Sequence, residues 1–202
     1  MSPRSKLIKP KLLVASTIYG YEDQLSSIYA QLSSYGYDFL NSHMGTVLAN
    51  PSKSNLESCL DAVKECDAIL GIIRPTYGSG VLEDGGLSIT HQEIRLAIAL
   101  NKARWFLAHR DVIFARQLLK KISCTGVHEG GGAVIKVAPS SSFDVRSIDV
   151  YNEVIKSSEP PAERIGHWAQ EFYRFDEMLA FIRAQFEDID KVVAIIKAMK
   201  HE

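Results

Sequence analysis

The feature that most constrains the fold is a regular alternation of short apolar segments with longer helical segments, which runs from Lys11 to about Ile122. The most apolar segment, Ala68 to Ile73 (AILGII), has the length and composition of a strand buried on both faces of a sheet. Helices between consecutive strands act as right-handed crossover connections, which make the strands parallel. The sequence therefore predicts an α/β fold. Strands are expected at 11–16, 37–40, 68–73, 103–108 and 168–173.

The helices expected between these strands are indicated by apolar stripes and by signals at their ends. The first has Leu25 and Ile28 on its stripe and ends before Gly36, a typical residue after a helix C-terminus. Ser54 and Glu57 form a capping-box pattern that starts the second. The apolar face of the last expected helix, with Val192, Ile195, Ile196 and Met199, is either part of the core, which we favour, or an association surface. Further helices are expected over about 89–101, up to about 122, over 145–157, and around the apolar residues Met178, Leu179, Ile182, Phe186, Val192, Ile195, Ile196 and Met199.

The length of the chain limits the number of domains. Its 202 residues, of which 46% are hydrophobic, are enough for one domain with a substantial core. We expect a loose arm at 1–10 and a single α/β domain over 11–202. An irregular excursion is expected at about 124–165. Its first part, 124–145, is rich in glycine and serine and is expected to be an exposed excursion or a hairpin that contains 133–137.

Charge and cysteine content argue against several classes of protein. The net charge is -1, whereas nucleic-acid-binding proteins usually carry a clustered basic surplus. No apolar run reaches the roughly 20 residues of a membrane span, and the polar start has no apolar segment of a secretory signal. Cys59, Cys66 and Cys124 lack metal-ligand spacing, and the first two are expected to be packing residues. We therefore expect a cytoplasmic protein with no metal and with neither nucleic acid nor membrane as a partner.

The loop after the most apolar strand is the first candidate for a ligand site. Open parallel sheets bind ligands beyond the carboxyl ends of their strands, so the segments 16–20, 41–45 and 74–88 are the relevant exits. Glycines in the third exit allow a ligand to approach the backbone, and Tyr77 could stack on a base. A loop that merely turns the chain would use the same residues. The patterns GxGxxG and GxxxxGK[ST] are absent, so neither a dinucleotide fingerprint nor a phosphate loop is present.

Glu93 is the second candidate, because helical spacing places it among apolar residues. Leu96 and Ala97 follow it by three and four positions, and Ile89 and Thr90 precede it by four and three. A carboxylate that faces inward costs free energy unless it is paired or lines a polar cavity. It is therefore either a site residue or, in the plainer interpretation, a helix-start glutamate that is favoured by the helix dipole.

The histidines near these segments give weaker signals. A helix separates His91 and Glu93 by about 200°, so a catalytic pair is not expected. We expect His91 to cap the helix or to meet solvent, and His43, at the second exit, to be solvated. No GxSxG or HExxH pattern occurs.

Four motifs resemble a family of TIR-like domains of unknown function, whose members are often found at the N-terminus of multidomain signalling and anti-phage defence ATPases. The family signs are a first strand ending in SST, a CD pair before the third strand, an RYGS loop and an SxTxxE helix start. Here the corresponding segments are 11–20, 58–67, 77–79 and 88–93. The resemblance covers about 10–122 and, more loosely, 165–190. This chain departs from it with Ala15 in the first motif and with Thr76 in place of the loop arginine, for which Arg74 could substitute.

A wider resemblance, to nucleoside deoxyribosyltransferases and enzymatic TIR domains, implies a five-stranded flavodoxin-like fold and a chemistry. Both groups place a catalytic glutamate early in the helix after the third strand, and Glu93 takes that position here. The resemblance implies a carboxylate at the anomeric carbon of a ribosyl group, where an oxocarbenium ion develops. Residues implied at the ligand are Thr17, Tyr19, Tyr77, Gly78, Ser79, Ser88 and Thr90.

These observations leave three functions open. The first is an N-glycosidase that cleaves the base–ribose bond of NAD or a related nucleotide in defence or stress signalling, without a further cofactor. The second is a non-catalytic module that binds a small nucleotide or associates with itself or with a partner signalling protein. The third is an adaptor without a ligand, for which the 124–165 excursion would provide contacts.

Overall fold

The computed structural model describes residues 9–41, 45–47, 50–78, 86–125 and 142–200, with side chains described up to residue 121 in the fourth of these ranges. Five strands form one sheet in the order β2-β1-β3-β4-β5, and all four neighbouring pairs are parallel. This order belongs to the flavodoxin-like class of doubly wound folds, which confirms the predicted fold. The strands are β1 (Lys11–Ser16), β2 (Asp38–Leu40), β3 (Ala68–Ile73), β4 (Ala103–His109) and β5 (Gln170–Phe172).

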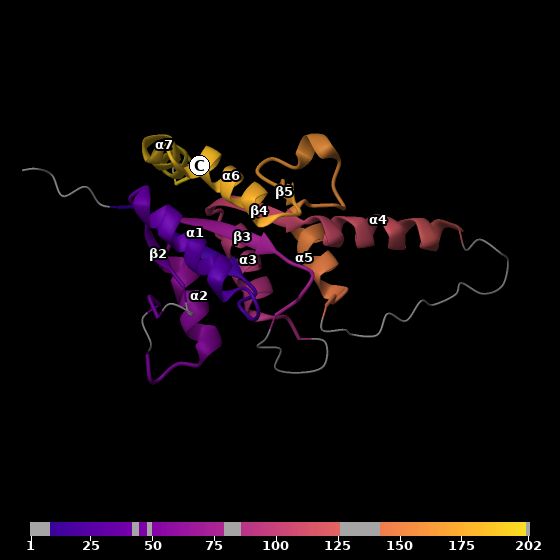
Figure 1. Cartoon of the computed structure of the whole chain (residues 1–202), viewed down its shortest axis with the longest axis horizontal. Helices are drawn as coiled ribbons and strands as arrows, with labels where there is room; N and C mark the ends of the chain where they lie inside the picture. The colour runs from indigo at the N-terminus through magenta and orange to yellow at the C-terminus, as the bar shows by residue number, and fades with distance from the viewer. Residues whose placement is uncertain (1–8, 42–44, 48–49, 79–85, 126–141, 201–202) are drawn as a thin grey trace, which may run out of the picture.

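Helices cover both faces of the sheet (Figure 1). One face carries α1 (Glu22–Ser34), α6 (Phe175–Phe186) and α7 (Ile189–Met199). The other carries α2 (Asn55–Glu65), α3 (Ile89–Ala99) and α5 (Arg146–Val154), with the start of α4 (Arg110–Thr125) packed beside α5. A short 3₁₀ turn, η1 (Pro161–Glu163), precedes β5. Among the described helices, none combines the length and hydropathy that crossing a membrane would need.

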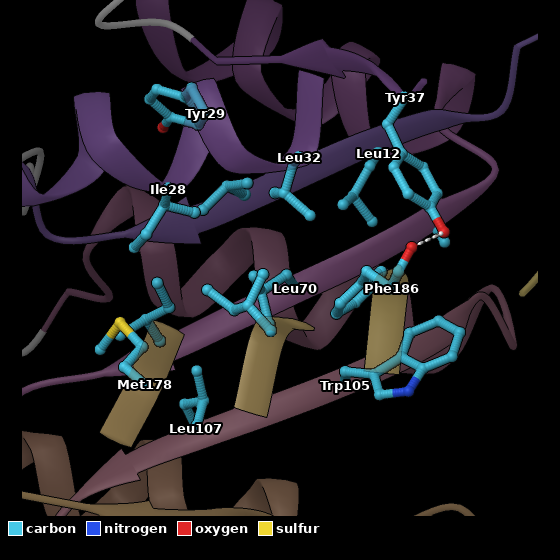
Figure 2. Close-up of a cluster of buried hydrophobic side chains, with 14 of the residues drawn as sticks. Leu12, Ile28, Tyr29, Leu32, Tyr37, Leu70, Trp105, Leu107, Met178 and Phe186 are labelled. Atoms are coloured by element: carbon cyan, nitrogen blue, oxygen red, sulfur yellow. Dashed lines mark hydrogen bonds between the residues drawn. The ribbon is translucent and has the colours of Figure 1, made fainter. Parts of the chain in front are cut away.

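The core lies in two layers because successive residues of each strand point to opposite faces. On the first face Leu70 and Trp105 pack against helix residues such as Phe186, as Figure 2 shows. The Tyr37 hydroxyl donates a 3.0 Å hydrogen bond to the Phe186 carbonyl, so the buried phenol is satisfied. On the second face Ile69 packs with apolar residues of α2 and α3. Every residue of β3 is buried, as its unbroken apolar run predicts.

Most predicted elements lie within a few residues of their expected positions, and the differences concern the later part of the chain. The fifth strand, expected at 168–173, is shorter and comprises only Gln170–Phe172. Trp168 lies before it and is 48% exposed. The expected hairpin near 133–137 lies outside the described residues. In α7, Val192 and Ile196 are buried in the first core layer, which confirms that this face belongs mainly to the core.

Gly71, in the middle of β3, is a position where a methyl group has no room. A Cβ there would lie 2.6 and 2.8 Å from ring carbons of Phe106, which is fully packed in the second core layer. We expect Gly71→Ala to lower the free energy of unfolding by about 1–3 kcal/mol, measured by urea denaturation. A double variant with Phe106→Leu should cost less than the sum of the two single changes. Simple additivity would show that the ring is not the obstacle.

Candidate functional site

A cavity of about 290 Å³ lies at the carboxyl ends of β1 and β3. The chain leaves β1 toward α1 on one face and β3 toward α3 on the other, so these neighbouring strands form the switch point of the sheet. Open α/β sheets bind ligands at that point, and the volume is near the lower end of small-ligand sites. The cavity is lined by Leu13, Val14, Ser16, Thr17, Ile18, Tyr19, Asn41, Asn55, Thr76, Gly78, Ile89, Thr90 and Glu93.

Glu93 is the acidic residue of this lining, and α3 positions it. The helix begins after Ser88, whose hydroxyl accepts a hydrogen bond from the His91 amide at 3.3 Å. One turn later the Glu93 side chain reaches the cavity wall while remaining only 8% exposed. Burial raises the pKa of its carboxyl to about 8, and a hydrogen bond from Cys59 opposes this rise. In the described part of the chain Glu93 forms no ion pair, so its charge is uncompensated whenever it ionises.

The loops after β1 and β3 are tied together beside Glu93. The Thr17 hydroxyl donates to the Thr76 carbonyl at 3.0 Å, and Arg74 Nη1 donates to the Thr17 carbonyl at 3.1 Å. Gly78 has a φ of +94°, and a Cβ there would lie 3.3 Å from Thr17 Cγ2. Glycine therefore permits both the backbone conformation and the close approach of the two loops.

Arg74, which could have substituted for the loop arginine of the family pattern, does not line the cavity. Its guanidinium lies 4.0 Å from the centre of the Tyr21 ring and also binds the Thr17 carbonyl. Arg74 is absent from the lining of the cavity, so it acts on the β1 loop instead.

Asn41 and Asn55 complete the wall on the side of β2, and neither was identified from the sequence. Asn41 is 5% exposed, and its side-chain amide lies 3.5 Å from the Val14 carbonyl, to which it donates. Asn55 is the first residue of α2. The position of Asn41 directly after a strand was a usable signal, since that exit was expected to face the ligand. Asn55 is brought in by the packing of α2 against α3, which no local pattern indicates.

The structure brings together five of the eight residues expected at the site. Thr17, Tyr19, Gly78, Thr90 and Glu93 all line the cavity, and Tyr19 does so while 90% exposed, which places it at the rim. Ser88 is 1% exposed and serves as the cap of α3 behind the cavity wall. Ser79 and His43 lie outside the described residues.

Tyr77 corrects the expectation of a base-stacking residue. Its ring is 5% exposed, and its hydroxyl lies 2.7 Å from His91 Nδ1. The Arg146 guanidinium covers the ring at 4.4 Å from its centre, so no base can stack there. The expectation failed because Arg146 belongs to α5, which is distant in sequence and closes over this side of the loop.

His91 was expected at a cap or in solvent and is instead 1% exposed. Besides the Tyr77 hydroxyl it meets Glu153 of α5, whose Oε1 lies 3.2 Å from Nε2, although the angle falls short of a hydrogen bond. Burial lowers the pKa of His91, and the nearby Glu153 carboxylate opposes this. As the helical repeat predicted, His91 and Glu93 have separate surroundings, with His91 beside α5 and Glu93 at the cavity.

Comparison with known proteins identifies the family. The sequence profile described as "Domain of unknown function (DUF4062)" matches residues 11–125, which is more than half of the chain. The chain belongs to the DUF4062 family. The matched span contains all four motifs on which the resemblance to a family of unknown function was based. No curated protein matches the chain.

Two solved structures resemble this DUF4062 chain remotely. One is the CMP N-glycosidase BcmB of Clostridium botulinum, at 21% identity and a TM-score of 0.35, with 50% of this chain and 70% of that chain covered. The other is a 2-desoxiribosyltransferase from Leishmania mexicana, at 12% identity and a TM-score of 0.43, with 88% of this chain and 98% of that chain covered.

Proposed function

We propose that this chain cleaves the bond between base and ribosyl group in a nucleotide, with Glu93 as the carboxylate that acts at the anomeric carbon. The observation that carries the proposal is a buried carboxyl group in the wall of a cavity at the switch point, without a cationic partner among the described residues. Burying such a group without a partner costs free energy. A cost of this kind at a cavity is typical of groups that serve a ligand.

The lack of a cationic partner for Glu93 among the described residues suits a reaction that develops positive charge on its substrate. When a glycosidic bond breaks, the anomeric carbon and the ring oxygen gain positive charge, as in an oxocarbenium ion. A fixed carboxylate in a poorly solvated site stabilises that charge in the transition state more than in the ground state, which is the condition for catalysis. A resident lysine or arginine would neutralise the carboxylate and remove this preference.

The raised pKa favours a cationic substrate such as NAD. Near neutral pH the Glu93 carboxyl is largely protonated in the free protein, since its pKa is about 8. A cationic nicotinamide ring beside it would lower that pKa and bring Glu93 into its ionised form. Nicotinamide also leaves as a neutral molecule, so its departure needs no added proton.

The reaction balances as a hydrolysis. The bond from the anomeric carbon to the base nitrogen breaks, and its electron pair goes to the base. Glu93 either stabilises the ribosyl cation or bonds to it until water replaces it. A new bond forms to the water oxygen, and the water proton passes to solvent. For NAD the products are ADP-ribose and nicotinamide.

The remaining lining suits a sugar at the centre of the cavity and a base near the rim. Thr90 and the two asparagines offer groups that can hydrogen-bond ribose hydroxyls. Tyr19 takes the stacking role that Tyr77 cannot, because its ring is exposed at the rim. The resemblance to TIR-like proteins supports the further proposal that such an activity serves defence or stress signalling.

One observation also favours a second candidate, a module that binds a nucleotide without turnover. A Glu93 carboxyl that stays protonated would donate a hydrogen bond to a ligand, as its pKa of about 8 allows. Such a module would show a higher melting temperature with its nucleotide, and Glu93→Gln would keep that shift because the amide also donates.

The decisive experiment is mass spectrometry of the protein with NAD and a panel of nucleotides. We expect release of the base by the wild type and a loss of at least about 10³-fold in kcat for Glu93→Gln. Glu163→Gln, which makes the same change at an exposed site, should retain full activity. Absence of base release from every member of the panel, at high protein concentration, would refute the glycosidase.

A further inference from the structure

Cys59 lies directly behind Glu93, on the neighbouring helix. Helices α2 and α3 pack side by side on the second face of the sheet, and Cys59 on α2 is 1% exposed between them. Its thiol forms a hydrogen bond with the Glu93 carboxyl. Cys59 does not line the cavity, whereas Glu93 does. The thiol therefore contacts the carboxyl from the protein side and leaves its other side to a ligand.

Asn55 extends this contact into a chain of three side chains. It lies one turn before Cys59 on the same face of α2, and its Oδ1 is 3.8 Å from Cys59 Sγ. Asn55 and Glu93 both line the cavity, with Cys59 between and behind them. The two cavity residues are thus connected through one buried sulfur atom.

The single proton of the thiol gives this chain a direction. A thiol has one S–H, so it cannot donate to both Asn55 and Glu93. A carboxylate only accepts hydrogen bonds, whereas an asparagine amide can turn its N–H₂ group toward the sulfur in place of its oxygen. Both contacts are satisfied when the Asn55 amide donates to Sγ and the thiol donates to the ionised Glu93.

Two other titratable side chains of the described residues sense the Glu93 charge, and both stay neutral near pH 7. They are Tyr29 of α1 and Cys66 at the end of α2. Burial raises the pKa of the Tyr29 phenol well above its ordinary value and that of the Cys66 thiol to about 11, so both stay protonated. Cys66 also donates to the carbonyl of Val63 in its own helix, at 3.1 Å. Cys59 is therefore the group positioned to act on the ionisation of Glu93.

We propose that Cys59 is a positioning residue for Glu93, whose thiol, held by the Asn55 amide, donates a hydrogen bond that orients the carboxylate toward the cavity. A weak neutral donor is suited to this task. It fixes the direction of the carboxylate and favours its ionised form modestly, without supplying the positive charge that the ribosyl group must bring. The proposal rests on the glycosidase function for its consequence, although the contact itself can be tested without turnover.

The test measures the titration of Glu93 directly, by the ¹³C chemical shift of its carboxyl carbon between pH 5 and pH 10. The signal is assigned as the one missing in Glu93→Gln. We expect Cys59→Ala to raise the pKa of Glu93 by about 0.5 to 1, because a donor to the ionised form is lost. Cys59→Ser, a stronger donor, should keep the wild-type pKa or lower it. Cys66→Ala is the matched control, since it removes a buried thiol that bonds elsewhere and should leave the titration unchanged.

Kinetics provide the second measurement. In Cys59→Ala the pH profile of kcat/KM for NAD should move in parallel with the titration, and kcat should fall several-fold while KM changes less. Cys59→Ser should restore both. An unchanged Glu93 titration in Cys59→Ala, or in Cys59→Val if the alanine variant does not fold, would overturn the positioning role, because both changes remove the donor. If Cys59→Ala shifts the Glu93 titration as expected but the wild type releases no base, the glycosidase function is refuted and the positioning role of Cys59 stands.

Discussion

Replacing Glu93 with glutamine is expected to stabilise the folded protein, and the gain is expected to grow with pH. The pKa of Glu93 is about 8 in the folded state because of burial, against an ordinary value of 4.5. Between these two values the folded protein holds a proton that the unfolded chain has lost. The free energy of unfolding of the wild type must therefore fall as pH rises through this window, by about 1.4 kcal/mol per pH unit for one group. Glutamine does not ionise and escapes this loss.

The size of the effect has an upper limit set by the window. Between pH 4.5 and pH 8 the pKa difference of this single group lowers the free energy of unfolding by at most about 5 kcal/mol, and above pH 8 it lowers it no further. We expect a smaller gain, a few kcal/mol at pH 9, because the buried amide of glutamine must also find partners. At pH 5 the wild type and the variant should differ by less than about 1 kcal/mol, since Glu93 is then protonated.

Urea denaturation at pH 5, 7 and 9 measures this difference, with Glu163→Gln as the exposed control. The control should follow the wild type at every pH. Parallel pH dependence of wild type and Glu93→Gln would mean that the carboxyl is ionised at ordinary pH, with a partner not identified among the described residues. A gain in stability together with a loss of turnover would show that the fold tolerates an unfavourable group for the sake of its reaction.

The sequence predicted those features of the candidate site that local spacing along the chain determines. Glu93 was expected to face inward because a helix repeats every 3.6 residues, and neighbours such as Ala97 placed it on the buried stripe. The position of the cavity followed in the same way, since strand exits in a parallel sheet meet at one edge. Thr17 and Gly78 lie at those exits and line the cavity.

The sequence was misleading where a distant element covers a local one. Tyr77 has the neighbours of an exposed loop residue, yet α5 covers its ring with Arg146. His91 is buried by the same helix through Glu153. Neither contact has a local signature, because the segment that leads into α5 follows an excursion that no periodicity defines. Cys59 was correctly expected to be a packing residue, but its contact with Glu93 depends on how α2 and α3 pack.

His91 is expected to contribute strongly to stability because it joins three parts of the fold. Its Nδ1 forms a 2.7 Å hydrogen bond with the Tyr77 hydroxyl, and its other nitrogen faces Glu153 of α5. His91→Ala would leave a void beside the second core layer and would remove the hydrogen bond between the buried Tyr77 phenol and the imidazole. We expect a loss of about 3 kcal/mol in the free energy of unfolding. Arg95→Ala, which breaks the exposed 2.9 Å pair with the same Glu153, should cost less than about 1 kcal/mol.

A double-mutant cycle separates the hydrogen bond from the void. Tyr77→Phe alone should cost about 1 kcal/mol, because the buried His91 nitrogen then lacks its hydrogen-bond partner, and much less in the His91→Ala background. Equal costs in both backgrounds would show that the two side chains act independently. The His91→Ala change also affects the candidate site, since Tyr77 lies between Thr76 and Gly78 of the cavity wall. Loosening Tyr77 should therefore weaken nucleotide binding although no residue at the cavity has been altered, which a thermal-shift titration of His91→Ala against wild type would measure.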